Sequence, residues 1–100
     1  MTTSKGSKIA VRNVNHPWSV RQVDAKMYEA MKRALLNVLP KTPPGASLAE
    51  IHEQLPAHLP EELFPKGAKA GWWAKTVQLD LEAKGFVLRA KTRPVRLRRR

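Results

Sequence analysis

The side chains with the clearest chemical capacity are the lysines and arginines near the two ends of the chain. The 100-residue sequence holds 19 Lys and Arg against 8 Asp and Glu, a formal net charge of +11. Residues 23–84 carry equal numbers of basic and acidic side chains, so the whole excess lies in residues 1–22 and 85–100. Because guanidinium and ammonium groups bind phosphates, this distribution predicts a neutral folded body with basic ends that contact a polyanion. The open alternative is that basic ends only keep a small protein in solution.

Residue patterns typical of enzymes and metal sites are absent from the sequence. The chain has no cysteine, which excludes a disulfide framework, an iron–sulfur cluster and a thiolate zinc site. His52 and His58 are separated by Pro56 and lack the i, i+4 spacing of a helical metal pair. The segment Gly67–Gly71 lacks the GK[ST] ending of a phosphate-binding loop. We therefore expect no enzymatic activity, no cofactor and no metal.

Apolar spacing and capping residues predict three helices. The helices are expected over about Ala25–Leu39, Leu48–Leu55 and, starting at Ala68 or Gly71, up to Lys84. Asp24 is a suitable N-cap for the first helix. Ser47 and Glu50 form the S-x-x-E pattern of a capping box at the second. Gly85 stands where a glycine in the left-handed conformation ends a helix, so it predicts the end of the third.

Extended segments are predicted on both sides of this helical region. After the third helix the apolar period changes to two, which predicts a hairpin with strands over Phe86–Ala90 and Val95–Arg98. Near the N-terminus, Met1–Gly6 is expected to be disordered, and Ile9–Val14 to be a short strand or an extended arm. The apolar side chains of Trp18 and Val20 are expected to hold this arm on the body. A turn is predicted at residues 15–18, directly after the segment Ile9–Val14.

The order of the predicted elements resembles a winged helix-turn-helix domain, an α+β fold in which three helices are followed by a two-stranded β-hairpin wing. The segment Leu79–Arg89, L-D-L-E-A-K-G-F-V-L-R, resembles the end of a winged-helix recognition helix and the start of its wing. The positions of Leu81, Gly85, Phe86 and Val87 fit the regulator pattern L-E-x-x-G-L-[IV]-x-R. The resemblance divides the chain into a basic, partly disordered N-terminal arm (1–22), a winged-helix domain (23–98) and a basic C-terminal end (99–100).

Three motifs make the chain similar to a family of small uncharacterised bacterial proteins with a domain of unknown function. The motifs are N-H-P at Asn15–Pro17, V-D-A-x-x-Y-x-A-M at Val23–Met31 and W-W-x-K-T-V-Q-L-D-L-E-A-x-G at Trp72–Gly85. This resemblance covers about residues 13–98 and implies no activity. DNA binding is implied by the winged-helix analogy alone, and a fold does not determine a function.

In the winged-helix pattern the third helix enters the major groove and the wing contacts the DNA backbone or the minor groove. The resemblance therefore implies groove contacts by Lys69, Lys75, Thr76 and Gln78. It implies phosphate contacts, with a salt-dependent affinity, by Arg89, Lys91, Arg93, Arg96 and Arg98. Asp80 and Glu82 would repel phosphates, so one of them is expected to pair with a basic residue of the wing or the first helix. The expected partner is double-stranded DNA, as for a transcriptional regulator.

Trp72 and Leu79 support a second interpretation. The helical wheel places both on the face opposite Trp73, where they would read bases poorly but would form a good protein contact. A protein partner is therefore the alternative to DNA. The winged-helix resemblance separately implies a homodimer, because winged-helix regulators often bind as dimers. For Trp72 a purely structural role, half-buried against the proline-rich loop and the N-terminal arm, also stays open. With no apolar run of about 18 residues and no apolar segment in Met1–Lys8, we expect no membrane contact and a cytoplasmic location.

Overall fold

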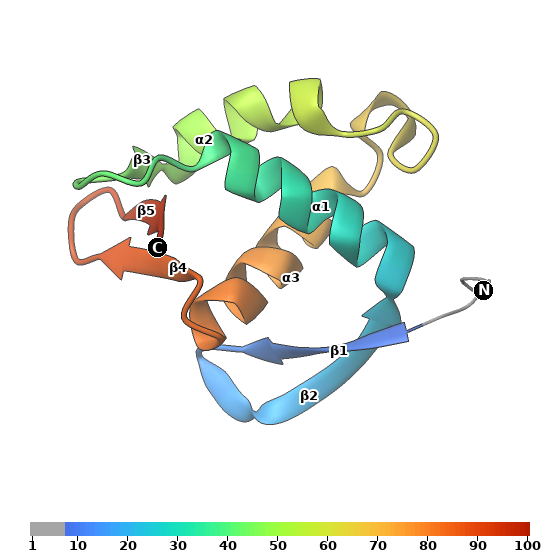
Figure 1. Cartoon of the computed structure of the whole chain (residues 1–100), viewed down its shortest axis with the longest axis horizontal. Coiled ribbons are helices and arrows are strands. Elements are labelled where there is room, and N and C mark those ends of the chain that lie inside the picture. Colours follow the sequence, from blue (N-terminus) through green and yellow to red (C-terminus); the bar gives the residue numbers. More distant parts are fainter. Residues whose placement is uncertain (1–7) are drawn as a thin grey trace.

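The computed structural model of the chain describes residues 8–100, without the side chains of residues 17 and 19. The chain is an α+β protein with three α-helices and two small antiparallel sheets (Figure 1). Its elements are β1 (Lys8–Asn13), β2 (His16–Asp24), α1 (Ala25–Val38), β3 (Ala46–Ser47), α2 (Leu48–Gln54), α3 (Ala70–Ala83), β4 (Val87–Ala90) and β5 (Arg96–Arg99). Short 3-10 turns at Leu55–His58 and Pro65–Gly67 connect α2 to α3. The disorder expected for Met1–Gly6 lies outside the described residues.

Local capping sets the ends of the helices as the sequence predicts. The Asp24 carboxylate accepts a hydrogen bond from the backbone N–H of Met27 at 3.0 Å, and α1 begins at the next residue. Ser47 Oγ accepts from the N–H of Glu50 at 3.2 Å, and the Glu50 carboxylate accepts from the N–H of Ser47 at 2.8 Å. Gly85 follows α3 in the left-handed conformation, with φ of 82°. The three predicted helices are confirmed, with boundaries that agree within a few residues.

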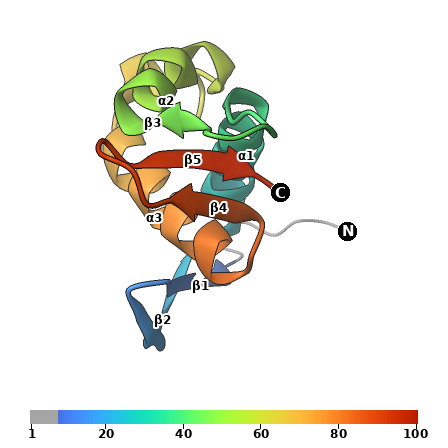
Figure 2. The same ribbon diagram turned by 90° about the vertical axis from the view of Figure 1, so that its left-hand side faces the viewer.

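The C-terminal hairpin belongs to a three-stranded sheet with the strand order β3–β5–β4, which Figure 2 shows along one side of the helices. The predicted hairpin is confirmed, with Val87 opposite Arg99, while the short strand β3 was not predicted. Ala46 of β3 lies opposite Leu97 of β5. The preceding Gly45 has φ of 93°, and a Cβ there would lie 2.5 Å from the carbonyl oxygen of Leu97. Only glycine satisfies both conditions, so Gly45 allows β3 to approach β5.

The N-terminal segment is a hairpin, β1–β2, that packs against α3 (Figures 1 and 2). Val11 and Val23 point into the core and are 4% and 6% exposed. Trp18 and Val20 are 78% and 49% exposed. The prediction that Trp18 and Val20 hold this segment on the body is therefore wrong. Side chains alternate between the two faces of a strand. Val23 lies on the inward face of β2, so Trp18 and Val20, at even-numbered positions, lie on the outward face.

The main core lies between α1 and α3 and continues under the β1–β2 hairpin. Tyr28 and Met31 of α1 and Val77 and Leu81 of α3 are at most 1% exposed. Burial of each such apolar side chain stabilises the fold by about 1.5–3 kcal/mol. Because α1 covers one side of α3 and β1 another, only a strip of α3 reaches solvent. None of the helices in residues 8–100 is long and apolar enough to cross a membrane.

Candidate nucleic-acid interface

Two of the predicted wing arginines are bonded within the fold. Arg89 on β4 donates from Nε and Nη2 to the two carboxylate oxygens of Glu82, at 2.7 and 2.9 Å. This hydrogen bonding raises the pKa of Arg89. Arg96 on β5 donates from Nη1 to the carbonyl oxygen of Gly45 at 2.9 Å, and the same nitrogen lies 3.4 Å from Glu50 Oε1. These contacts fix the direction of both guanidiniums and offset their charge, although each keeps further N–H donors, so phosphate contact by Arg89 and Arg96 stays a prediction.

The other three predicted wing cations have no such partners. Lys91 and Arg93 are exposed in the turn between β4 and β5, and Arg98 is half-buried on β5. Within residues 8–100, none of these three side chains forms an ion pair or a side-chain hydrogen bond. Glu82, which stands near β4, is already paired with Arg89 as the sequence predicts for an acid of this helix. The positive charge at the hairpin turn is therefore left uncompensated.

The predicted groove contacts on α3 differ in their accessibility. Lys69 is exposed just before α3, in the left-handed conformation with φ of 63°. Lys75 is exposed and Thr76 is half-buried. Gln78 is only 9% exposed, and its Nε2 donates to Glu82 Oε2 at 2.9 Å. The expectation that Gln78 reaches a DNA groove is therefore wrong, because the hydrogen bond and the packing around α3 hold its side chain within the protein.

The two residues proposed for a protein interface, Trp72 and Leu79, differ in exposure, because the N-terminal hairpin packs over only one of them. Leu79 is only 7% exposed, so its expected position on the solvent face of α3 is wrong. The hairpin covers that part of the helix, a long-range contact that a helical wheel does not contain. Trp72 remains 47% exposed. Its ring meets Trp73 edge-on at 5.1 Å, and the Arg21 guanidinium lies 5.9 Å from the ring centroid.

Asp80 is a fully buried carboxylate, for which the sequence predicts no more than an ion pair with a base of the wing or the first helix. It accepts hydrogen bonds from the backbone N–H of Arg12 at 2.7 Å and from the hydroxyl of Tyr28, and Lys84 Nζ lies 2.9 Å from its Oδ2. Asp80 thus connects β1, α1 and α3. Tyr28 and Asp80 both lie in the motifs that carry the family resemblance, which is the one signal that could have found them. Burial, and then the hydrogen bond to Asp80, raise the pKa of Tyr28 above its ordinary value.

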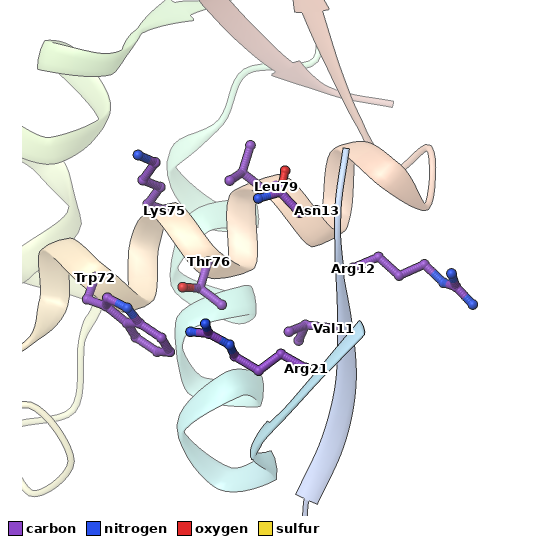
Figure 3. A pocket seen from close by; sticks show the side chains of 8 residues that line it. All are labelled: Val11, Arg12, Asn13, Arg21, Trp72, Lys75, Thr76 and Leu79. Atoms are coloured by element: carbon purple, nitrogen blue, oxygen red, sulfur yellow. The ribbon is translucent and has the colours of Figure 1, made fainter. Parts of the chain in front are cut away.

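A cleft of about 310 Å³ lies between the N-terminal hairpin and α3. Figure 3 shows the side chains of Arg21 and Trp72 extending toward each other at its opening, with Thr76 beside them. Lys75 points away from Arg21 and Trp72, and the side chain of Arg12 extends outward from β1. None of the described residues that line the cleft is acidic. Residues 8–100 also contain no cluster of His, Asp and Glu that could hold a metal ion.

These features define a small α+β protein whose interface candidates are a basic hairpin turn and a basic, aromatic cleft. A family of unknown function, DUF6958, matches residues 8–97, and the chain belongs to this family. The match confirms the family resemblance found in the sequence, and it includes the β1–β2 hairpin, β3, β4 and the first two residues of β5. Neither a curated protein nor a solved structure matches the chain significantly.

Proposed function

We propose that this protein binds double-stranded DNA and contacts its phosphates with the turn of the C-terminal hairpin, as in a transcriptional regulator of the winged-helix type. One observation carries the proposal: Lys91 and Arg93 project an uncompensated positive charge from the β4–β5 turn, while the neighbouring acid Glu82 is already paired with Arg89. Uncompensated cations at an exposed turn attract phosphates and release the counterions bound to DNA. The binding energy is therefore mainly electrostatic.

The arrangement of the elements supports a winged-helix mode of docking. Three helices precede the β4–β5 hairpin, and the short strand β3 joins the sheet beside β5, between α1 and α2 in the chain. In winged-helix proteins the third helix enters the major groove and the hairpin lies on the adjacent backbone. The equivalent elements here are α3 and the turn that carries Lys91 and Arg93.

The N-terminal hairpin limits what α3 contributes to this mode. It covers Leu79. In contrast, Lys69 just before the helix, and Lys75 and Thr76 in its first half, keep access to solvent. Lysine ammonium groups contact phosphates readily but offer no planar pair of donors for a base edge. We therefore propose that phosphate contacts dominate and that discrimination between DNA sequences is small.

A charge-reversal experiment tests this proposal. The double variant Lys91→Glu/Arg93→Glu is compared with Lys26→Glu/Arg33→Glu, which changes the net charge equally at two exposed positions of α1. Affinity for a labelled duplex is measured by fluorescence anisotropy at several salt concentrations. The slope of log K against log salt is negative, and each lost phosphate contact reduces its magnitude by about 0.9, so the wing variant should reduce the magnitude by about 2.

The expected result is a loss of affinity of about tenfold or more for the wing variant near 0.15 M salt, and a much smaller loss for the α1 variant. Equal losses in both variants would mean that only net charge matters and would overturn the role of the hairpin turn. Far-UV circular dichroism of both variants controls for folding.

The protein-binding alternative rests on Trp72, because Leu79 is buried. An apolar interface centred on Trp72 would depend weakly on salt, unlike phosphate binding. This alternative would be favoured over DNA if Trp72→Ala abolished the binding of a protein partner without lowering the stability of the fold, and if that binding did not depend on salt. The uncompensated cations of the hairpin turn favour DNA.

A further inference from the structure

The cleft between the N-terminal hairpin and α3 has the chemistry of a ligand site and lies apart from the β4–β5 turn. Its volume of about 310 Å³ suits a single small ligand or one unit of a polymer. Its inner wall includes the buried side chains of Val11 and Leu79, and its opening carries polar and aromatic groups. Such a combination of an apolar wall and a few polar groups is typical of small-molecule sites.

Arg21 supplies a donor group for an anion at this opening. It lies on β2 opposite Val11, so the strand directs its side chain toward α3, as Figure 3 shows. The guanidinium lies 5.9 Å from the centroid of the Trp72 ring, and it forms no hydrogen bond or ion pair with another described residue. A guanidinium has five N–H donors in one plane, and a contact with a ring leaves those donors available. A phosphate oxygen pair is the acceptor that matches this geometry.

Trp72 supplies a surface for a planar group next to that donor. Its ring is 47% exposed and is supported edge-on by Trp73 at 5.1 Å, with an interplanar angle of 85°. A ring that is already held in place loses little conformational entropy when a ligand packs against it. Nucleic-acid bases stack on such side chains with little dependence on base identity.

The remaining polar groups of the cleft fit the same ligand. Thr76 and Asn13 line it, and Lys75 also belongs to the lining, although its ammonium points away from Arg21 and Trp72 in Figure 3. Because none of the described lining residues is acidic, nothing in the cleft opposes a negative charge. An anionic group bonded by Arg21 would be next to a planar group packed on Trp72.

We propose that this cleft binds a nucleotide, with the phosphate on Arg21 and the base against Trp72. The nucleotide is either free in solution or an unpaired unit of a nucleic-acid strand, since both present a phosphate and a planar base. The inference does not rest on duplex binding, because Lys91 and Arg93 do not line the cleft.

Side-chain NMR of the isotope-labelled protein tests the proposal with adenosine monophosphate as the probe. The Trp72 indole N–H and the Arg21 Nε–H signals are followed near 0.15 M salt. We expect saturable shifts at both, with a Kd of about 1 mM or tighter, and binding by inorganic phosphate at least about tenfold weaker. Absence of saturation, or phosphate binding as tight as the nucleotide, overturns the proposal.

Matched variants separate the cleft from general charge effects. Arg21→Ala is expected to weaken binding of the probe about tenfold or more, Arg21→Lys to an intermediate extent, and Arg33→Ala on α1 hardly at all. Trp72→Leu is expected to weaken the binding of the nucleotide but not the binding of inorganic phosphate. Equal effects of Arg21→Ala and Arg33→Ala overturn the site. Because Arg21→Lys keeps the charge and most of the aliphatic stem, it tests the site even if the alanine variant perturbs the hairpin.

A second arm identifies the source of the nucleotide. A short single-stranded oligothymidylate is titrated in parallel and compared per nucleotide with the mononucleotide. Tighter binding of the strand at Trp72 and Arg21 assigns the cleft to an unpaired nucleic-acid segment, and tighter binding of the mononucleotide assigns it to a free ligand. The wing variant Lys91→Glu/Arg93→Glu should bind the mononucleotide unchanged, so failure of duplex binding and failure of this site are distinguished.

Discussion

Tyr28→Phe is the sharpest test of the buried network that connects β1, α1 and α3. The substitution removes the hydroxyl that donates to Asp80 and keeps the aromatic ring, which is packed in the core. A hydrogen bond to a charged group contributes about 1.5–3 kcal/mol. Asp80 would keep the N–H of Arg12 and the ammonium of Lys84 as partners. We therefore expect a loss of about 2 kcal/mol, near the middle of that range.

Urea unfolding followed by tryptophan fluorescence measures this loss at neutral pH. For a chain of this size it should also lower Tm by about 10 °C. A double-mutant cycle with Asp80→Asn isolates the pair, and its coupling energy should exceed about 1 kcal/mol. Thr92→Ala is the control, since its hydroxyl bonds the carbonyl of Pro94 at an exposed position. A loss below about 0.5 kcal/mol for Tyr28→Phe, or no coupling to Asp80, would refute the reasoning.

The same substitution has a pH signature. Burial and then Asp80 raise the pKa of Tyr28, so the folded chain keeps the phenolic proton to higher pH than the unfolded chain does. The contribution of Tyr28 to stability is therefore complete below its ordinary pKa of about 10 and is lost as pH rises above it. Tyr28 is the only tyrosine in the chain, so tyrosinate absorbance reports on it alone. Tyr28→Phe should remove this alkaline loss, and tyrosinate formation in the wild type should coincide with unfolding.

Three further substitutions test other parts of the fold, each by chemical denaturation. Ser47→Ala removes the cap of α2 and should cost about 1 kcal/mol, and an unchanged midpoint would contradict the capping role. Leu79→Ala should cost about 2–3 kcal/mol because Leu79 is buried under the N-terminal hairpin, whereas a neutral effect would place it at the surface. Gly45→Ala should destabilise the fold by about 1–3 kcal/mol, because an alanine there would have a positive φ and a Cβ too close to the Leu97 carbonyl. An unchanged stability of this variant would contradict the requirement for glycine at this position.

The internal pairing of charges explains why net charge alone locates the interface poorly. Arg89 and Arg96 belong to the basic C-terminal segment, yet both bond acceptors within the fold. The same contacts neutralise Glu82 and Glu50, which would otherwise repel phosphates near the hairpin. Lys91 and Arg93 at the β4–β5 turn remain without an ion pair among residues 8–100, and only the folded structure separates them from the paired arginines of the same segment.

The positions of the helices and of the C-terminal hairpin followed from the sequence alone. Asp24, the pair Ser47 and Glu50, and Gly85 act on backbone groups a few residues away, so their effects can be read directly along the chain. The change to a two-residue apolar period after α3 is equally local. The family also followed from the sequence, because its motifs are continuous segments.

Burial and charge pairing were decided only by the tertiary structure. Arg12 and Asp80 are 68 positions apart in the chain, and Tyr28 and Asp80 are 52 apart, so no local pattern brings them together. The packing of β1 on α3 buries Leu79 and forms the cleft of Arg21 and Trp72 at the same time. A helical wheel shows which side chains share a face, but the element that covers that face is chosen by the whole fold.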